Sequence, residues 1–95
     1  MSIVAVVDFR IRPDHHERAR TVFQTMLSQT RAWEGAESIE WLQDRDDPDR
    51  WTLYERWASA EHEASYRTFR AHEGAMPELR DVLAGAPTLW RFDPL

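Results

Sequence analysis

The stretch RWTLYERWASAEHEASYRTFRAHEG, residues 50–74, contains the most abrupt change of hydrophobic periodicity in the chain. Its first eight residues alternate as in a strand, with one side formed by Trp51, Leu53, Glu55 and Trp57. Ser59 then provides a helix N-cap, Glu61 and Glu63 follow in the first turn, and Gly74 is a helix stop. The stretch therefore predicts a strand that passes directly into a helix.

This junction is the first candidate for a functional site. On the predicted helix, His62 and Tyr66 are four positions apart and share a face, which Phe69 extends. A histidine and a tyrosine beside aromatic rings such as Trp51 and Trp57 could handle a proton in a pocket. The alternative interpretation is structural: Tyr66 and Phe69 are core residues, and His62 is a polar residue of the first turn.

The remaining elements follow from the same signals. Residues 3–11 predict a strand that is apolar on both faces in its first half. Asp14 is the expected N-cap of a long helix, with Glu17 in capping-box spacing and Gly35 at its end. Its apolar stripe comprises Ala19, Val22, Phe23, Met26, Leu27, Thr30 and Trp33. A strand over residues 36–46, a turn at residues 46–49, a short helix beginning near Pro77 and a last strand over residues 88–92 complete the chain.

The predicted element order is βαββααβ, an α+β, ferredoxin-like arrangement with an antiparallel sheet and helices on one face. The first, third and fourth strands carry apolar residues on both faces, so the face without helices also needs a cover. A second copy of the same sheet is the simplest cover. We therefore expect a homodimer whose sheets pack face to face, and a single domain over residues 1–95.

Composition narrows the function classes. The chain has a net charge of −5 and no basic cluster, so we expect neither a nucleic-acid nor a membrane partner. It contains no Cys and no Lys, which excludes disulfides, thiolate nucleophiles and lysine Schiff bases. The apolar start of the chain is interpreted as a strand and not a signal peptide, which favours a cytoplasmic protein.

Metal and nucleotide motifs are missing. His-Glu occurs at His16, His62 and His72, but none completes a His-Glu-x-x-His zinc motif. The three glycines stand far apart, so no phosphate-binding glycine loop can form. Glu55 and Arg56 are interpreted as an ion pair without catalytic meaning. We expect no metal site and no cofactor.

Three segments resemble a known family. DRDDPDRWTLYERWAS, residues 44–59, and YRTFRAHEG with LRDVLAGAPTLWRFD, residues 66–74 and 79–93, are similar to the antibiotic biosynthesis monooxygenase domain. The resemblance implies a dimeric α+β barrel and oxygenation of an aromatic polyketide (an anthrone) or a quinol by O2, without metal or flavin. Haem-degrading relatives use an Asn-Trp-His set, which this chain cannot assemble because it has no Asn.

The resulting hypothesis is a cofactor-independent monooxygenase that uses His62 and Tyr66 for proton handling. Its expected substrate contacts are Trp51, Tyr54, Arg56, Trp57, Phe69 and His72, with Arg56 as an anion contact. Two alternatives share the same pocket: a non-catalytic dimeric module that binds a small hydrophobic metabolite, and an isomerase or cyclase. Only the oxygenase consumes O2.

Overall fold

The computed structural model describes residues 1–95. The elements follow one another as β1 (Ile3–Arg10), α1 (His16–Ala32), β2 (Ala36–Gln43), β3 (Arg50–Trp57), α2 (Ala60–Ala71), α3 (Pro77–Val82) and β4 (Thr88–Phe92). This is the predicted βαββααβ order. No helix is both long and apolar enough to cross a membrane.

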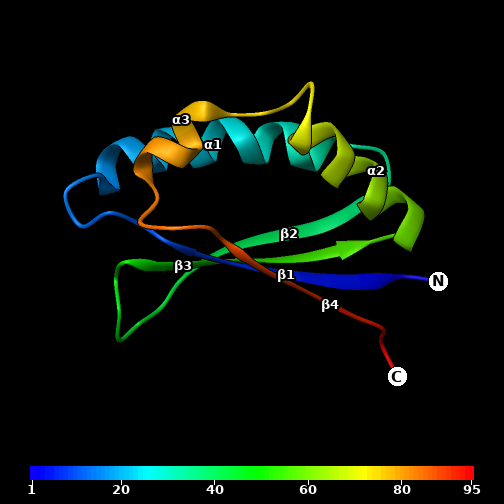
Figure 1. The fold of residues 1–95 in the computed structure, drawn as a ribbon. Helices are drawn as coiled ribbons and strands as arrows, with labels where there is room; N and C mark the ends of the chain where they lie inside the picture. The colour runs from blue at the N-terminus through cyan, green and yellow to red at the C-terminus, as the bar shows by residue number, and fades with distance from the viewer.

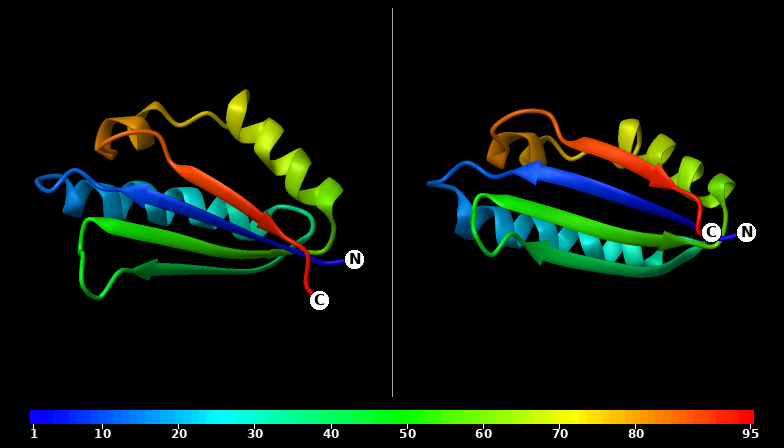
Figure 2. Two further views of the ribbon diagram at one scale, coloured as in Figure 1. Left: turned by 60° about the horizontal axis from the view of Figure 1, so that its bottom comes forward. Right: turned by 90° about the horizontal axis from the view of Figure 1, so that it is seen from below.

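The four strands form one antiparallel sheet in the order β2-β3-β1-β4. All three helices lie on the same face of this sheet (Figure 1), and the strands are in full view when the molecule is seen from the opposite side (Figure 2). The α+β, ferredoxin-like prediction is therefore confirmed. The sheet is open and does not close into a barrel within one chain.

The helix-facing side of the sheet forms the core with α1. The predicted stripe of α1 is buried over its helical part, from Ala19 to Thr30. Phe23 stands at its centre: its ring contacts Phe9 of β1 and Trp51 of β3 edge-on, each at 5.0 Å between centroids, and stacks on Trp41 of β2 at 5.6 Å. Three strands are thus fixed to α1 through one aromatic side chain.

The start of α1 differs from the prediction. The N-cap position is occupied by His15, and no side chain caps the helix there. Asp14 instead contacts the His15 ring, with 2.8 Å between Oδ1 and Nδ1. The capping box expected from Asp14 and Glu17 does not form, because the predicted cap lies one residue too early and its carboxylate is engaged by its neighbour.

The junction between β3 and α2 forms as predicted. Ser59 is the N-cap of α2, and its hydroxyl accepts a hydrogen bond from the backbone N–H of His62 at 3.2 Å. Ala58 also donates its N–H to the carbonyl of Gly35 at 2.8 Å, which ties the start of α2 to the loop between α1 and β2. The direction of α2 across the sheet is set here.

The face of the sheet without helices is uncovered in one chain. The large apolar side chains Leu42, Tyr54, Trp90 and Phe92 are exposed there, between 38% and 52% of their surface. Trp90 and Tyr54 are each paired with Val6 across the ladders, so they stand on the same face. An aromatic group of this kind on a sheet face is typical of an interface.

Candidate functional site

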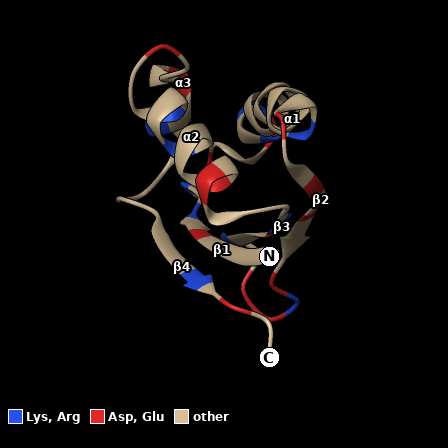
Figure 3. Ribbon diagram, turned by 90° about the vertical axis from the view of Figure 1, so that its right-hand side faces the viewer, with Lys and Arg blue, Asp and Glu red and all other residues tan.

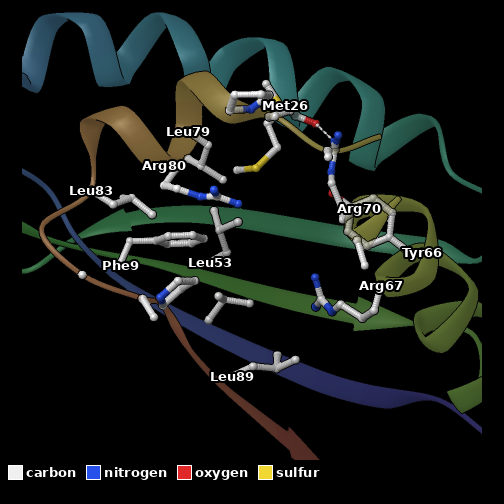
Figure 4. A pocket seen from close by; sticks show the side chains of 18 of the residues that line it. Phe9, Met26, Leu53, Tyr66, Arg67, Arg70, Leu79, Arg80, Leu83 and Leu89 are labelled. Atoms are coloured by element: carbon white, nitrogen blue, oxygen red, sulfur yellow. Dashed lines mark hydrogen bonds between the residues drawn. The ribbon is translucent and has the colours of Figure 1, made fainter. Parts of the chain in front are cut away.

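A cavity of about 700 Å³ lies between the helix-facing side of the sheet and helices α2 and α3. Its middle is apolar, formed by Val7, Phe9, Met26, Leu53, Leu79 and Leu89. In Figure 4, Tyr66, Arg67 and Arg70 of α2 lie at one end of the cavity, and the side chain of Arg80 extends from α3 toward Phe9 and Leu53. Cavities of this size and character, about 300–1,000 Å³ and largely apolar, are the usual sites for small organic ligands.

The cavity exists because α2 and α3 stand apart from the sheet on one side of α1. In the view along the strands, α1 covers the β2 and β3 side of the sheet, and α2 and α3 cover the other side (Figure 3). Gly74 makes the turn between them possible, because an added Cβ would lie 2.2 Å from the Phe69 ring. The short α3 then returns to the end of β1, where Ile11 bridges Leu83.

Tyr66 holds a buried hydrogen-bond chain at the α2 end. The hydroxyl of Thr30 donates a hydrogen bond to the carbonyl of Met26 at 2.9 Å. It therefore accepts a hydrogen bond from the Tyr66 hydroxyl, which it contacts closely. Arg70 donates from Nε to the same tyrosine oxygen at 2.7 Å. The proton of Tyr66 is therefore engaged, and its oxygen keeps one lone pair with which it can accept a hydrogen bond.

Arg70 carries a positive charge that no carboxylate balances. Besides Tyr66, its guanidinium donates to the side-chain oxygen of Gln29 at 2.8 Å and to the carbonyls of Met26 and Gly74 at 3.0 Å each. All four acceptors are neutral. A half-buried cation at the wall of an apolar cavity stabilises a negative charge that develops beside it.

Arg67, one residue after Tyr66, forms ion pairs with two buried carboxylates. Glu55 and Glu63 are each 1% exposed. Arg67 donates to both, to Glu63 from Nε at 2.7 Å, while Trp57 donates from its indole N–H to Glu55 at 2.9 Å. Arg91 of β4 donates to the other oxygen of Glu63 at 2.9 Å. No buried side-chain polar atom in the protein is left without a partner, so this network is electrostatically complete.

The Glu55 network corrects one sequence interpretation. Glu55 pairs with Arg67 of α2 and not with Arg56. Neighbours in a strand point to opposite faces, and Arg56 stands on the uncovered face. Two signals could have indicated the true partner: Glu63 and Arg67 have the spacing of a helical ion pair, and Glu55 lies on the apolar face of its strand.

Of the eight side chains predicted for the site, Tyr66 alone lines the cavity. Trp57 stands behind it, fully buried, with its ring 5.1 Å from the Tyr66 ring. Phe69 contacts Trp33 at 4.7 Å between ring centroids, on the α1 side of α2. Both therefore fix the position of Tyr66 without reaching the cavity.

The two predicted histidines lie elsewhere. His62 contacts the Ser59 hydroxyl through Nδ1 at 2.7 Å. Its ring also packs on Gly35, where φ is +89° and an added Cβ would lie 2.3 Å from the imidazole. His72 is exposed just after the end of α2. The i, i+4 spacing placed His62 and Tyr66 on neighbouring positions of α2, but the tilt of α2 brings the tyrosine alone to the cavity.

The other predicted contacts are separated from the cavity by the sheet or by α1. Tyr54 and Arg56 lie on the uncovered face, because they alternate with Leu53 and Glu55. Trp51 is 1% exposed beneath α1, where its indole N–H donates to the carbonyl of Pro48 at 3.1 Å. Their parts in substrate binding, like that of His62, stay predictions without support from the cavity.

Sequence reasoning missed the arginines of the cavity: Arg12, Arg67, Arg70 and Arg80. Arg70 could have been found, because it lies four residues after Tyr66 and so shares its side of the helix. Arg12 and Arg80 lack such a signal. Their backbone segments are adjacent because Arg12 donates its backbone N–H to the carbonyl of Val82 at 2.9 Å, at the end of α3.

The pKa shifts in this protein concern groups outside the cavity. Burial raises the pKa of Asp8, but hydrogen bonds from Thr52 and Arg50 outweigh it, so that pKa lies below the ordinary value. The pKa of Asp44 is lowered by the backbone N–H of Asp46 and by Arg50. Asp8 therefore stabilises the uncovered face of the sheet, and Asp44 stabilises the loop between β2 and β3. No group of three or more His, Cys, Asp or Glu side chains could hold a metal ion.

Comparison with known proteins places the amino-acid sequence in a family. Residues 2–68 match the family described as antibiotic biosynthesis monooxygenase. The match begins just before β1 and ends within α2, and it includes Glu55, Tyr66 and Arg67. No curated protein matches the chain.

Solved structures share the fold at low sequence identity. Rv0793 from Mycobacterium tuberculosis is 21% identical, with a TM-score of 0.85 over 100% of this chain and 96% of that one. A conserved protein from Methanosarcina mazei Go1 is 15% identical, with a TM-score of 0.86 over 97% of this chain and 91% of that one. A candidate antibiotic biosynthesis monooxygenase from Nitrosomonas europaea is 20% identical, with a TM-score of 0.87 over 99% and 90%.

Proposed function

This chain belongs to the antibiotic biosynthesis monooxygenase family, and on that premise we propose that it is a cofactor-independent monooxygenase that oxidises an aromatic polyketide (an anthrone) or a quinol with O2. One observation carries the proposal: the unbalanced charge of Arg70 stands beside the Tyr66 hydroxyl at the wall of a largely apolar cavity. A cation in such a place stabilises an aromatic anion bound beside it.

The chemistry needs an electron-rich anion in a dry site. For an anthrone, the substrate first loses a proton to solvent water at the opening of the cavity to form its enolate, and Arg70 lowers the free energy of that anion. The enolate transfers one electron to O2, and the resulting substrate radical and superoxide form a C–O bond. Protonation gives a hydroperoxide, which loses water. In sum, the CH2 group and O2 become C=O and H2O.

The side chains of the cavity have distinct parts in this scheme. The free lone pair of Tyr66 can accept a hydrogen bond from a substrate hydroxyl and so orient the ring. The apolar middle contacts the ring faces and excludes water, which strengthens the effect of Arg70. Arg67 is held by Glu55 and Glu63 and therefore serves to fix the wall.

The proposal is tested by oxygen uptake with a panel of anthrones and quinols, using metal-free and flavin-free protein. We expect uptake above the rate without protein, and a turnover lower by about 10- to 100-fold in Tyr66→Phe, which keeps the ring but loses the acceptor. Thr68→Val is the matched control, because it removes a hydroxyl from the exposed side of the same helix. His62→Ala should lose less turnover than Tyr66→Phe.

Other results of the oxygen-uptake experiment would contradict parts of the proposal. A larger loss in His62→Ala than in Tyr66→Phe would move the site from the cavity to the β3–α2 junction. Equal turnover in Tyr66→Phe and wild type would remove Tyr66 from the mechanism. Ligand binding in the cavity with no uptake over the whole panel would contradict the oxygenase and favour a binding module.

The uncovered sheet face supports a further part of the proposal, a homodimer formed by two such faces. Leu42, Tyr54, Trp90 and Phe92 present apolar surface there that a second copy would bury. Sedimentation velocity should give twice the mass of one chain. Trp90→Glu should shift the protein to the monomer, because it places a charge in the apolar interface, whereas Gln24→Glu on the exposed side of α1 should not. A monomeric wild type would contradict the dimer.

A further inference from the structure

The side chains that line the cavity are mostly positive, whereas the protein as a whole is negative. The chain has a net charge of −5, but the charged side chains that line the cavity are four arginines, Arg12, Arg67, Arg70 and Arg80, and one glutamate, Glu55. Positive charge concentrated in a low-dielectric recess attracts anionic ligands and repels cations. An acidic protein with a basic cavity is therefore suited to an anionic small molecule.

The four arginines differ in what they already bind. Arg67 is neutralised by Glu55 and Glu63, and Arg70 is held by four neutral acceptors at the α2 end. The side chains of Arg12 and Arg80 form no ion pair and no hydrogen bond within the chain. Their donors are thus free to bind a ligand.

Arg12 and Arg80 both line the cavity, and their backbone segments meet at the α3 end. Arg12 follows β1 and is tied to the last residue of α3 by its backbone hydrogen bond to Val82. Arg80 lies two residues before Val82, and its side chain extends from α3 over Phe9 and Leu53 toward the centre of the cavity (Figure 4). Guanidinium groups suit carboxylates best, because their paired N–H donors match the two carboxylate oxygens.

We propose that the substrate is an aromatic acid whose carboxylate is bound by Arg12 and Arg80 at the α3 end of the cavity. Its ring system then lies on the apolar middle, and its reacting ring is directed to Tyr66 and Arg70 at the α2 end. This assignment rests on the proposed function for the reaction, but the binding step it describes is independent of oxygen. Arg12 and Arg80 act as specificity residues.

The test compares two non-reacting ligands of the same shape, anthraquinone-2-carboxylate and anthraquinone-2-carboxamide, by isothermal titration calorimetry. The wild type should bind the carboxylate about tenfold more tightly or better, since charged hydrogen bonds distinguish the two. The preference should weaken as salt is raised. In the double variant Arg12→Gln/Arg80→Gln the carboxylate should lose about tenfold in affinity, while the carboxamide changes little.

The matched control is Arg18→Gln/Arg45→Gln, which changes the net charge equally but removes no arginine of the cavity. It should keep the preference. Equal affinity for the two ligands in the wild type, failure to bind the carboxylate, or the same loss in the control would overturn the assignment. The oxygenase proposal fails separately, if the carboxylate preference is present and anthrones bearing a carboxylate are bound without O2 uptake.

Discussion

Replacing Arg67 by leucine is expected to lower the free energy of unfolding by about 3–5 kcal/mol at neutral pH, the largest loss from any single charge in the protein. The variant removes the cation that Glu55 and Glu63 share, although both carboxylates are 1% exposed. Glu55 would keep only the indole N–H of Trp57, and Glu63 only Arg91. Urea unfolding followed by tryptophan fluorescence measures the loss.

A second substitution separates charge from packing. Adding Glu55→Gln to Arg67→Leu should restore part of the lost stability, because the glutamine removes one unbalanced charge and can still accept from Trp57. Arg45→Leu, in the loop between β2 and β3, is the control for loss of an arginine, and we expect little change there. A loss of about 1 kcal/mol or less in Arg67→Leu would show that water reaches the two carboxylates in the folded protein.

Replacing Arg70 by glutamine is expected to have the largest effect on activity, a fall in kcat of about 100- to 1,000-fold. The guanidinium is the cation beside Tyr66 that no carboxylate neutralises, so it stabilises an anion formed from the substrate. KM should change less than kcat, because the reacting ring of the substrate is still uncharged on binding and gains little from the charge of Arg70. Oxygen uptake under saturating substrate measures the effect.

Two further variants keep this prediction falsifiable. Arg70→Lys retains the charge without the planar donor group, so its loss should be smaller than that of Arg70→Gln. Arg31→Gln is the matched control: Arg31 also donates to a neutral acceptor, the carbonyl of Ile39 at 3.1 Å, but it lies outside the cavity. Thermal unfolding of each variant shows whether it is folded. A folded Arg70→Gln with wild-type kcat would exclude the electrostatic role.

Hydrophobic periodicity was sufficient for the fold. The alternation around Leu53, the stripe of α1 and the Ser59 cap each depend on residues close together in the sequence, and each appears in the structure where it was predicted. The start of α1 was wrong by one residue, because a cap depends on backbone angles and on the competing contact between Asp14 and His15. The resemblance of residues 44–59 to the family is confirmed by the match over residues 2–68.

The candidate site was predicted only in part. Tyr66 was identified because its position on α2 is local information, and it does line the cavity. The other aromatic residues could not be sorted in the same way. A tryptophan in a sequence is equally suited to a core, an interface or a ligand, and Trp51 and Trp57 prove to be core residues.

The amino-acid sequence is therefore enough to establish the strands, the long helix and the face that each strand turns toward the helices, because those depend on spacing along the chain. Tertiary packing decides where the cavity opens and which charges meet in it. Arg12 and Arg80 are 68 positions apart in the chain, and Glu55 reaches Arg67 only because α2 crosses above β3. The strength of an ion pair depends on the distance between its charges in space. Which charges pair is therefore decided only when the helices pack on the sheet.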